Sequence, residues 1–179
     1  IEQVRSFVTG HGAACGIASN QPRQPPVILS IAGRTTTVIP AHTPFMLTGQ
    51  ARSPHANAAL TYTWEQTDLG PEQAEQSPLR DLGAGPIFRS YPPTPQGTRI
   101  FPNIRAILGE EMSGLGEVYP ATTRELNFRL TVRDNLAANA STSYIDRKIQ
   151  VLDTKQAFVV TEPTRATKWT VPRKQYVRW

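Results

Sequence analysis

The sequence is poor in the residues from which most catalytic and metal sites are built. It contains one cysteine, Cys15, and three histidines, His11, His42 and His55, among 179 residues. A single cysteine excludes an internal disulfide. A zinc peptidase needs two histidines one helical turn apart with a glutamate between them, and no pair here has that spacing. A glycine-rich phosphate loop is also missing. We therefore expect no enzyme activity from this chain.

Long apolar runs are missing as well. No run approaches the ~20 apolar residues that a membrane-spanning helix requires, so we expect no membrane span. No signal peptide opens the chain. A fragment excised from a mature exported protein would have the same appearance, so this absence does not exclude secretion.

Base-reading motifs are absent, although the formal net charge is +5. Such a charge suits nucleic acid, an anionic glycan or a membrane surface. Most arginines are scattered, and the densest basic group lies near the C-terminus: Arg165, Lys168, Arg173, Lys174 and Arg178. Because no helix, finger or ribonucleoprotein motif that reads bases is present, we expect no nucleic-acid partner.

Proline and glycine, by contrast, are plentiful, with 16 and 12 residues, and they interrupt the chain at short intervals. This punctuation favours many short strands joined by turns. The strand patterns lie at residues 27–31, 36–39, 45–51, 60–65, 126–132 and 144–152. In residues 126–132, apolar and polar side chains alternate strictly, which is typical of an antiparallel strand with one face on a core.

These patterns predict an all-β fold, an antiparallel β-sandwich with a long irregular insertion. We expect the apolar faces of residues 60–64 and 126–132 to pack against each other across the two layers. The expected core anchors are Tyr62, Trp64, Phe128 and Leu130. Aromatic residues on a strand flanked by Thr and Glu are more typical of a core than of a carbohydrate platform.

The chain divides into three parts. Residues 1–26 contain a short amphipathic helix and a proline-rich linker, which we assign to the tail of a preceding domain. Residues 27–153 form the sandwich, and its insertion at 69–122 carries one helical turn at 104–108. Long loops of this kind are often functional. Residues 154–179 are expected to open a following β-domain.

The order of several segments resembles a known family. PFMLTGQA (44–51), LTYTWEQ (60–66) and LNFRLTVRDN (126–135) are similar to the PKD-like or cadherin-like module, an Ig-like β-sandwich, of secreted reprolysin-like bacterial zinc metallopeptidases. In that family the module follows the catalytic domain. GPIFRS (85–90) and RIFP (99–102) resemble the family's central insertion. Residues 5–16 resemble the end of the protease domain, and residues 158–179 resemble the next Ig-like module.

The resemblance implies several properties of the parent protein. It implies a secreted or cell-surface location, partners that are adjacent domains of the same polypeptide, and zinc only in the parent's catalytic domain. From the residues alone, Cys15 is either a free thiol or half of a bridge to a cysteine outside this chain. The family resemblance favours the bridge.

A calcium site is not expected where the family often has one. Its members often carry a turn of the Asp-Pro-Asp-Gly-Asp type before the Trp strand, whereas this chain has SPHANA (53–58) without a carboxylate. Calcium prefers many oxygen ligands, several of them charged. The remaining metal candidates are Glu65, Asp68 and Asp134, if strand pairing brings them to one end of the sandwich. The adjacent Glu110 and Glu111 are expected to be loop charges, not an acid/base pair.

The expected function is therefore a non-catalytic structural or interaction module that spaces or positions the catalytic domain of a secreted metallopeptidase. The alternative is a ligand-binding module for an extracellular polysaccharide or another polymer. That alternative rests on the positive charge and on Tyr91, Tyr119 and Trp169, which we expect to be exposed in or near loops.

Overall fold

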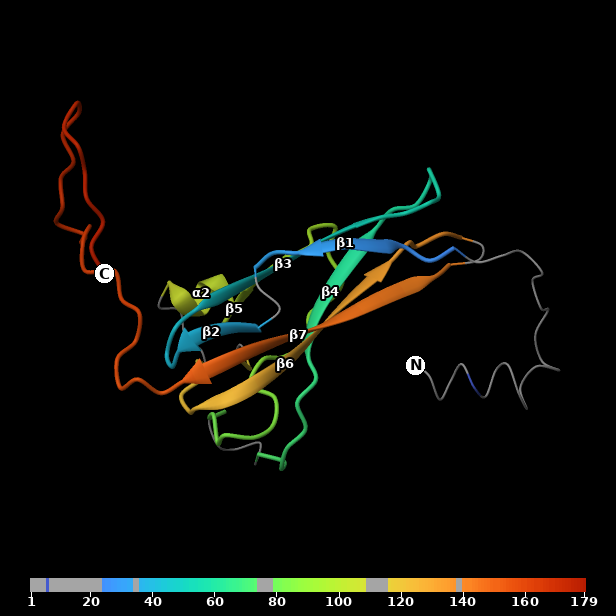
Figure 1. Cartoon of the computed structure of the whole chain (residues 1–179), viewed down its shortest axis with the longest axis horizontal. Helices are drawn as coiled ribbons and strands as arrows, with labels where there is room; N and C mark the ends of the chain where they lie inside the picture. Colours follow the sequence, from blue (N-terminus) through green and yellow to red (C-terminus); the bar gives the residue numbers. More distant parts are fainter. Residues whose placement is uncertain (1–5, 7–23, 34–35, 74–78, 109–115, 138–139) are drawn as a thin grey trace.

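The structure is a computed structural model of the chain (Figure 1). It describes Ser6 and residues 24–33, 36–73, 79–108, 116–137 and 140–179. The predictions made for the N-terminal helix, His11, Cys15, the first part of the linker, Glu110 and Glu111 lie outside the described residues, apart from Ser6.

The described residues are mostly β-structure, as expected. The strands are β1 (Val27–Ile31), β2 (Thr36–Pro40), β3 (Phe45–Arg52), β4 (Thr61–Gln66), β5 (Thr98–Phe101), β6 (Arg124–Arg133) and β7 (Thr142–Leu152), and α2 (Ile104–Ile107) is a single helical turn. Every strand predicted from residues 27–152 is present, and α2 occupies the predicted helical turn. Strand β5 was not predicted, because its four residues lie within the irregular insertion.

The strands form two sheets, with the orders β1-β3-β5 and β2-β7-β6-β4. Side chains from both sheets form one apolar core, which gives a sandwich-like architecture. One expectation is corrected: β2 runs parallel to β7, so the second sheet is mixed and not purely antiparallel. The chain leaves β1 in one sheet and continues into β2 in the other sheet. There β2 pairs with the free edge of β7 and runs in the same direction as β7.

The expected opposition of residues 60–64 and 126–132 is wrong. Strands β4 and β6 are antiparallel neighbours in one sheet, with Trp64 opposite Leu130 in the register. Their apolar side chains therefore share one face. The layer opposite them is the sheet β1-β3-β5, which contributes the buried Leu47 and Phe101 to the same core.

Strand β6 provides the centre of the core. Leu126, Phe128, Leu130 and Val132 are each 0% exposed, which confirms the core face predicted for this strand, although Thr131 on its other face is buried as well. The Phe128 ring lies 4.8 Å from that of Phe101, within a cluster of four phenylalanines that also includes Phe45 and Phe88. Offset and edge-on ring pairs at such distances are favourable beyond the area they bury.

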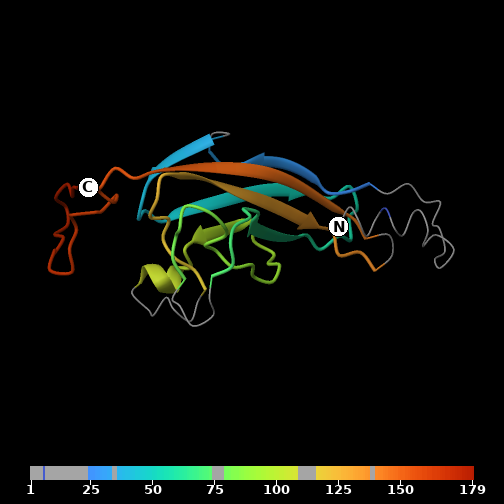
Figure 2. The ribbon, with the colours of Figure 1, turned by 90° about the horizontal axis from the view of Figure 1, so that it is seen from below.

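The insertion lies along one side of the two sheets, as Figure 2 shows in green and yellow. It contributes Ile87 and Phe88, which are 0% and 4% exposed, to the core. The insertion is thus part of the sandwich and not a loop attached to it.

Residues 158–179 differ from the rest, because every one of them is exposed. Residues 154–179 were expected to open a following β-domain, and in this segment the structure has no strand but an isolated antiparallel bridge between Glu162 and Arg178. The segment meets the sandwich near Thr43, whose Oγ1 accepts a hydrogen bond from the backbone N–H of Phe158.

Candidate functional site

The two sheets meet along one edge, where β5 places Arg99 beside β4. The Arg99 guanidinium donates hydrogen bonds to the carbonyl oxygens of Trp64 in β4 and Arg89 in the insertion. It also donates to Oε1 of Glu117, at 2.6 Å. One side chain of the first sheet therefore holds both the edge strand of the second sheet and two points of the insertion.

The ion pair at the centre of this contact is buried. The Glu117 side chain is 0% exposed and that of Arg99 is 13% exposed. The second carboxylate oxygen of Glu117 accepts the backbone N–H of Asn103, just before α2. Burial lowers the pKa of Arg99, and the nearby charge of Glu117 opposes that shift. Removing one member of such a buried pair leaves an uncompensated charge, so the contact fixes the insertion in place.

A small cavity of about 170 Å³ lies next to this ion pair. Its lining residues are Tyr62, Thr63, Trp64, Tyr91, Pro92, Thr94, Gln96, Thr98 and Arg99. The Arg99 guanidinium carbon lies 4.8 Å from the centre of the Tyr91 ring, which is within the range of a cation–π contact. The cavity is smaller than the ~300 Å³ or more of typical ligand pockets, so it suits a single side chain or sugar ring.

A second buried contact fixes the other part of the insertion. Asp81 accepts hydrogen bonds from the backbone N–H groups of Gly83, Ala121 and Thr122 and from the guanidinium of Arg124, the first residue of β6. The Arg124 and Asp81 side chains are 6% and 0% exposed. Burial raises the pKa of Asp81, but the hydrogen bonds from Arg124 and from its other donors outweigh this effect, so the pKa lies below its usual value.

The end of β4 forms a third contact with the insertion. Gln66 accepts the backbone N–H groups of Ile87 and Phe88 through its side-chain oxygen and donates to Asp68. Asp68 also accepts the backbone and side-chain N–H groups of Asn127 in β6. These bonds hold the two buried apolar residues of the insertion against the core.

The structure does not bring together the three carboxylates suggested as a metal site. Asp68 contacts Asn127 near the start of β6, whereas Asp134 follows the last residue of that strand. At ~3.3 Å per residue, the seven-residue separation along β6 corresponds to about 23 Å. Glu65 lies opposite Arg129 in the β4–β6 register, between those two ends. No group of three or more His, Cys, Asp or Glu residues suited to a metal ion occurs within the described part of the chain.

Asp134 has a structural environment of its own. It is 0% exposed and accepts hydrogen bonds from the backbone N–H of Leu136 and from the N–H and hydroxyl of Ser141. Burial raises the pKa of Asp134, but the bonds from Ser141 and Leu136 outweigh this effect and lower the pKa overall. The carboxylate therefore closes the β6–β7 connection.

The other predicted residues are placed as follows. Trp64, Phe128 and Leu130 are buried in the core, and Tyr62 is half-buried beside the cavity. The expected exposure of Tyr91 and Tyr119 is corrected: both are half-buried, because the insertion that carries them packs along the sheets. Trp169 is 52% exposed.

Sequence reasoning missed the two buried arginine–carboxylate contacts. Asp81, Glu117 and Arg124 follow no periodic pattern, and their partners are distant along the chain. The sequence contains a weak indication that the insertion packs on the core. The Ile-Phe pair occurs twice in the insertion, at 87–88 and 100–101, with an arginine beside each pair. Phe88 and Phe101, one from each pair, are buried in the core.

Comparisons with protein-family models, with curated proteins and with solved structures found no match to this chain. Within the described residues, no helix has the length and hydropathy that crossing a membrane would require.

Proposed function

We propose that this chain is a non-catalytic Ig-like, PKD-like module that spaces or positions a neighbouring catalytic domain of a larger secreted metallopeptidase. The observation that carries the proposal is the use of the buried carboxylates. Glu117 and Asp81 accept hydrogen bonds from Arg99 in β5 and Arg124 in β6, and Asp134 closes the connection between β6 and β7, so all three carboxylates are committed to structure. A rigid, internally fastened body of this kind is suited to holding other domains apart.

The strand pairings support the Ig-like assignment. In the immunoglobulin arrangement, strands A, B and E share one sheet and strands C, F and G share the other. If β1, β3 and β5 correspond to A, B and E, and β4, β6 and β7 to C, F and G, every pairing agrees. In this alignment β2 is a second part of strand A that joins the other sheet beside β7.

The centre of the core supports the same assignment. Immunoglobulin domains pack a buried Trp on strand C against a disulfide that joins strands B and F. Here Trp64 lies on β4 and is 3% exposed, and a Cβ added at Gly49 of β3 would collide with the Leu130 side chain of β6. The Gly49–Leu130 contact thus stands where that disulfide would be, beside the Trp.

The proposal is tested by assaying the purified chain for peptidase activity with and without added zinc. We expect no turnover, and we expect one cooperative thermal transition whose midpoint is unchanged by a chelator. Turnover that a chelator abolishes would contradict the proposal. In a longer protein that includes a catalytic domain, replacing residues 24–153 with a flexible linker of equal length should change activity on large protein substrates and leave cleavage of short peptides unchanged.

The cavity beside Arg99 favours a second function, the binding of an extracellular polysaccharide. Two tyrosines and a proline line it together with Thr, Gln and Arg side chains, a mixture that suits a sugar ring. Retention on immobilised neutral glycans should be lost in Tyr91→Ala and kept in Tyr144→Ala, which removes an exposed tyrosine outside the cavity. Equal retention of both variants would remove the cavity from consideration.

A further inference from the structure

The C-terminal segment, residues 154–179, carries all of the net charge of the chain. It contains six of the 19 Lys and Arg residues and one of the 14 acidic residues, which gives it a formal charge of +5. Residues 1–153 hold 13 residues of each sign and are formally neutral. The positive charge is therefore concentrated in a segment that packs little against the sandwich.

Within this segment, a bridge between Glu162 and Arg178 closes a loop, which we call the basic loop (residues 162–178). The two residues exchange backbone hydrogen bonds, and their side chains form an ion pair at 3.3 Å. Glu162 is the only acidic residue of the segment. The other basic residues of the loop form no ion pair with any acidic residue that the structure describes: Arg165, Lys168, Arg173 and Lys174.

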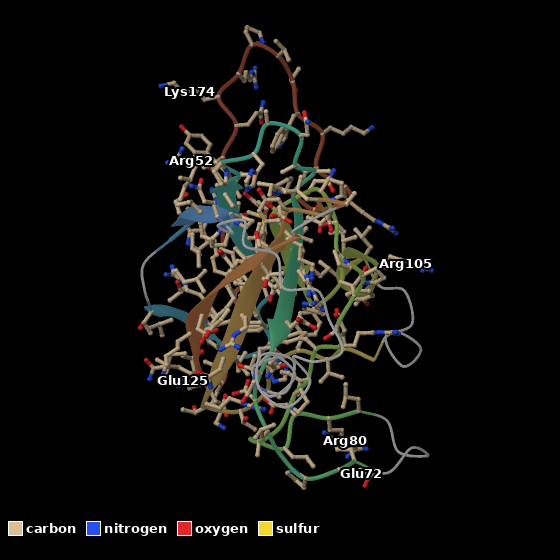
Figure 3. The ribbon with its side chains drawn as sticks, turned by 90° about the vertical axis from the view of Figure 1, so that its right-hand side faces the viewer. Arg52, Glu72, Arg80, Arg105, Glu125 and Lys174 are labelled. Atoms are coloured by element: carbon tan, nitrogen blue, oxygen red, sulfur yellow. The ribbon has the colours of Figure 1, made fainter. Side chains whose placement is uncertain are left out.

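The same loop exposes apolar side chains between its basic residues. Val171 is 91% exposed, Trp169 is 52% exposed and Tyr176 is 69% exposed. Trp179, next to the loop, is 75% exposed. Figures 1 and 2 show the segment extending away from one end of the sandwich, and Figure 3 shows Lys174 pointing into open space. The loop thus presents a surface that is both cationic and apolar.

We propose that the basic loop binds the surface of an anionic lipid bilayer. Lysine and arginine are attracted to anionic headgroups, and Trp and Tyr favour the boundary between headgroups and acyl chains. The exposed Val171 decides between partners, because an aliphatic side chain gains nothing from a sulfated glycan or a nucleic acid but is stabilised among acyl chains. This proposal is independent of the function proposed for the sandwich.

The charge requirement is tested with vesicles of phosphatidylcholine, with and without phosphatidylserine, in a sedimentation assay at low salt. The chain should bind only the vesicles that contain phosphatidylserine. R173Q/K174Q should weaken binding about thirtyfold, since each basic residue near an anionic surface contributes about fivefold. The control R52Q/R80Q removes the same charge from exposed positions on the sandwich and its insertion, and it should bind like the wild type. Equal losses from the two double variants would overturn the proposal.

The apolar requirement separates a bilayer from a polymer. V171S should weaken vesicle binding about tenfold and leave retention on dextran sulfate unchanged. The tryptophan emission should shift to shorter wavelength with phosphatidylserine vesicles, and this shift should be smaller in W169F. Unchanged vesicle binding by V171S, or binding to dextran sulfate alone, would assign the loop to a polyanion instead. Because every one of these residues is exposed, the melting temperatures should match that of the wild type.

Discussion

The sandwich and the C-terminal segment use the same residue types in opposite ways. In the sandwich, Arg99 and Arg124 are nearly buried and bind carboxylates of the insertion. In the C-terminal segment, Arg173 and Lys174 are exposed and have no described acidic partner. The tryptophans differ in the same way, with Trp64 in the core and Trp169 at the surface. Charge and aromatic content alone therefore do not distinguish a structural role from a binding role, whereas burial and pairing do.

The difference follows from what each region can bury. Strands β4 and β6 give the insertion an apolar face to cover, so its Ile87 and Phe88 pack inward and carry their polar neighbours with them. A charged group that is buried in this way must be paired, because an unpaired buried charge is strongly unfavourable. Residues 158–179 cover no such face among the described residues, so their charges are exposed to water.

The stability of the sandwich and of the C-terminal segment should differ most in response to matched tryptophan substitutions. Trp64→Ala removes a side chain that is 3% exposed and whose Nε1 donates to the carbonyl oxygen of Gly97 at 2.9 Å. We expect it to lower the free energy of unfolding by about 3–5 kcal/mol, as is typical for removing a large aromatic residue from a core. Trp169→Ala should change it by less than about 0.5 kcal/mol. Urea unfolding measures both, and an equal effect of the two substitutions would contradict the assignment of Trp64 to the core.

Matched glutamate substitutions should give the next largest difference in stability between the two regions. Glu117→Gln keeps the shape of the side chain but leaves the Arg99 charge without its buried partner, so we expect a loss of about 3 kcal/mol. Glu162→Gln breaks the pair with Arg178, whose side chain is 71% exposed. Solvent screens that pair, so its loss should cost less than about 1 kcal/mol. Thermal unfolding at neutral pH compares the two, and adding Arg99→Met to Glu117→Met shows how much of the loss comes from the buried Arg99 charge.

The strands were predictable because their signal is local. The alternation in β6 and the aromatic positions in β4 are visible in a short window. Burial confirms the apolar face of β6 and the position of Trp64, whereas Tyr62 is half-buried. The pairing of those two strands within one sheet was not visible, since a period of two identifies a buried face but not the layer opposite it. Strand β5 was missed because four residues between prolines and glycines give no periodic signal.

The polar contacts were less predictable than the strands for a related reason. Arg99 and Glu117 are 18 residues apart, and Asp81 and Arg124 are 43 residues apart. Nothing in the sequence near either member indicates its partner. The suggested convergence of Asp68 and Asp134 was wrong because the two residues lie near opposite ends of β6 and therefore cannot meet.

The pH dependence of stability should show the smallest difference, which is specific to the buried carboxylate of Asp81. The pKa of Asp81 lies below its usual value of 3.8 in the folded protein, so its contribution to stability is complete above that value. The contribution is lost as the pH falls below 3.8 and through the lower, folded pKa. The penalty of Asp81→Asn, measured by urea unfolding, should therefore be largest at neutral pH and shrink in acid.

Asp146 provides the control for this pH dependence. The hydrogen bond from Arg129 lowers the pKa of Asp146 as well, but the Asp146 side chain is 58% exposed. Because solvent and salt screen an exposed pair, Asp146→Asn should have a smaller effect that disappears at high salt. The effect of Asp81→Asn should persist at high salt, since its carboxylate is bonded to Arg124 and to three backbone N–H groups away from water. If salt removed both effects equally, the insertion would be held by surface charge, and the contrast with the C-terminal segment would be lost.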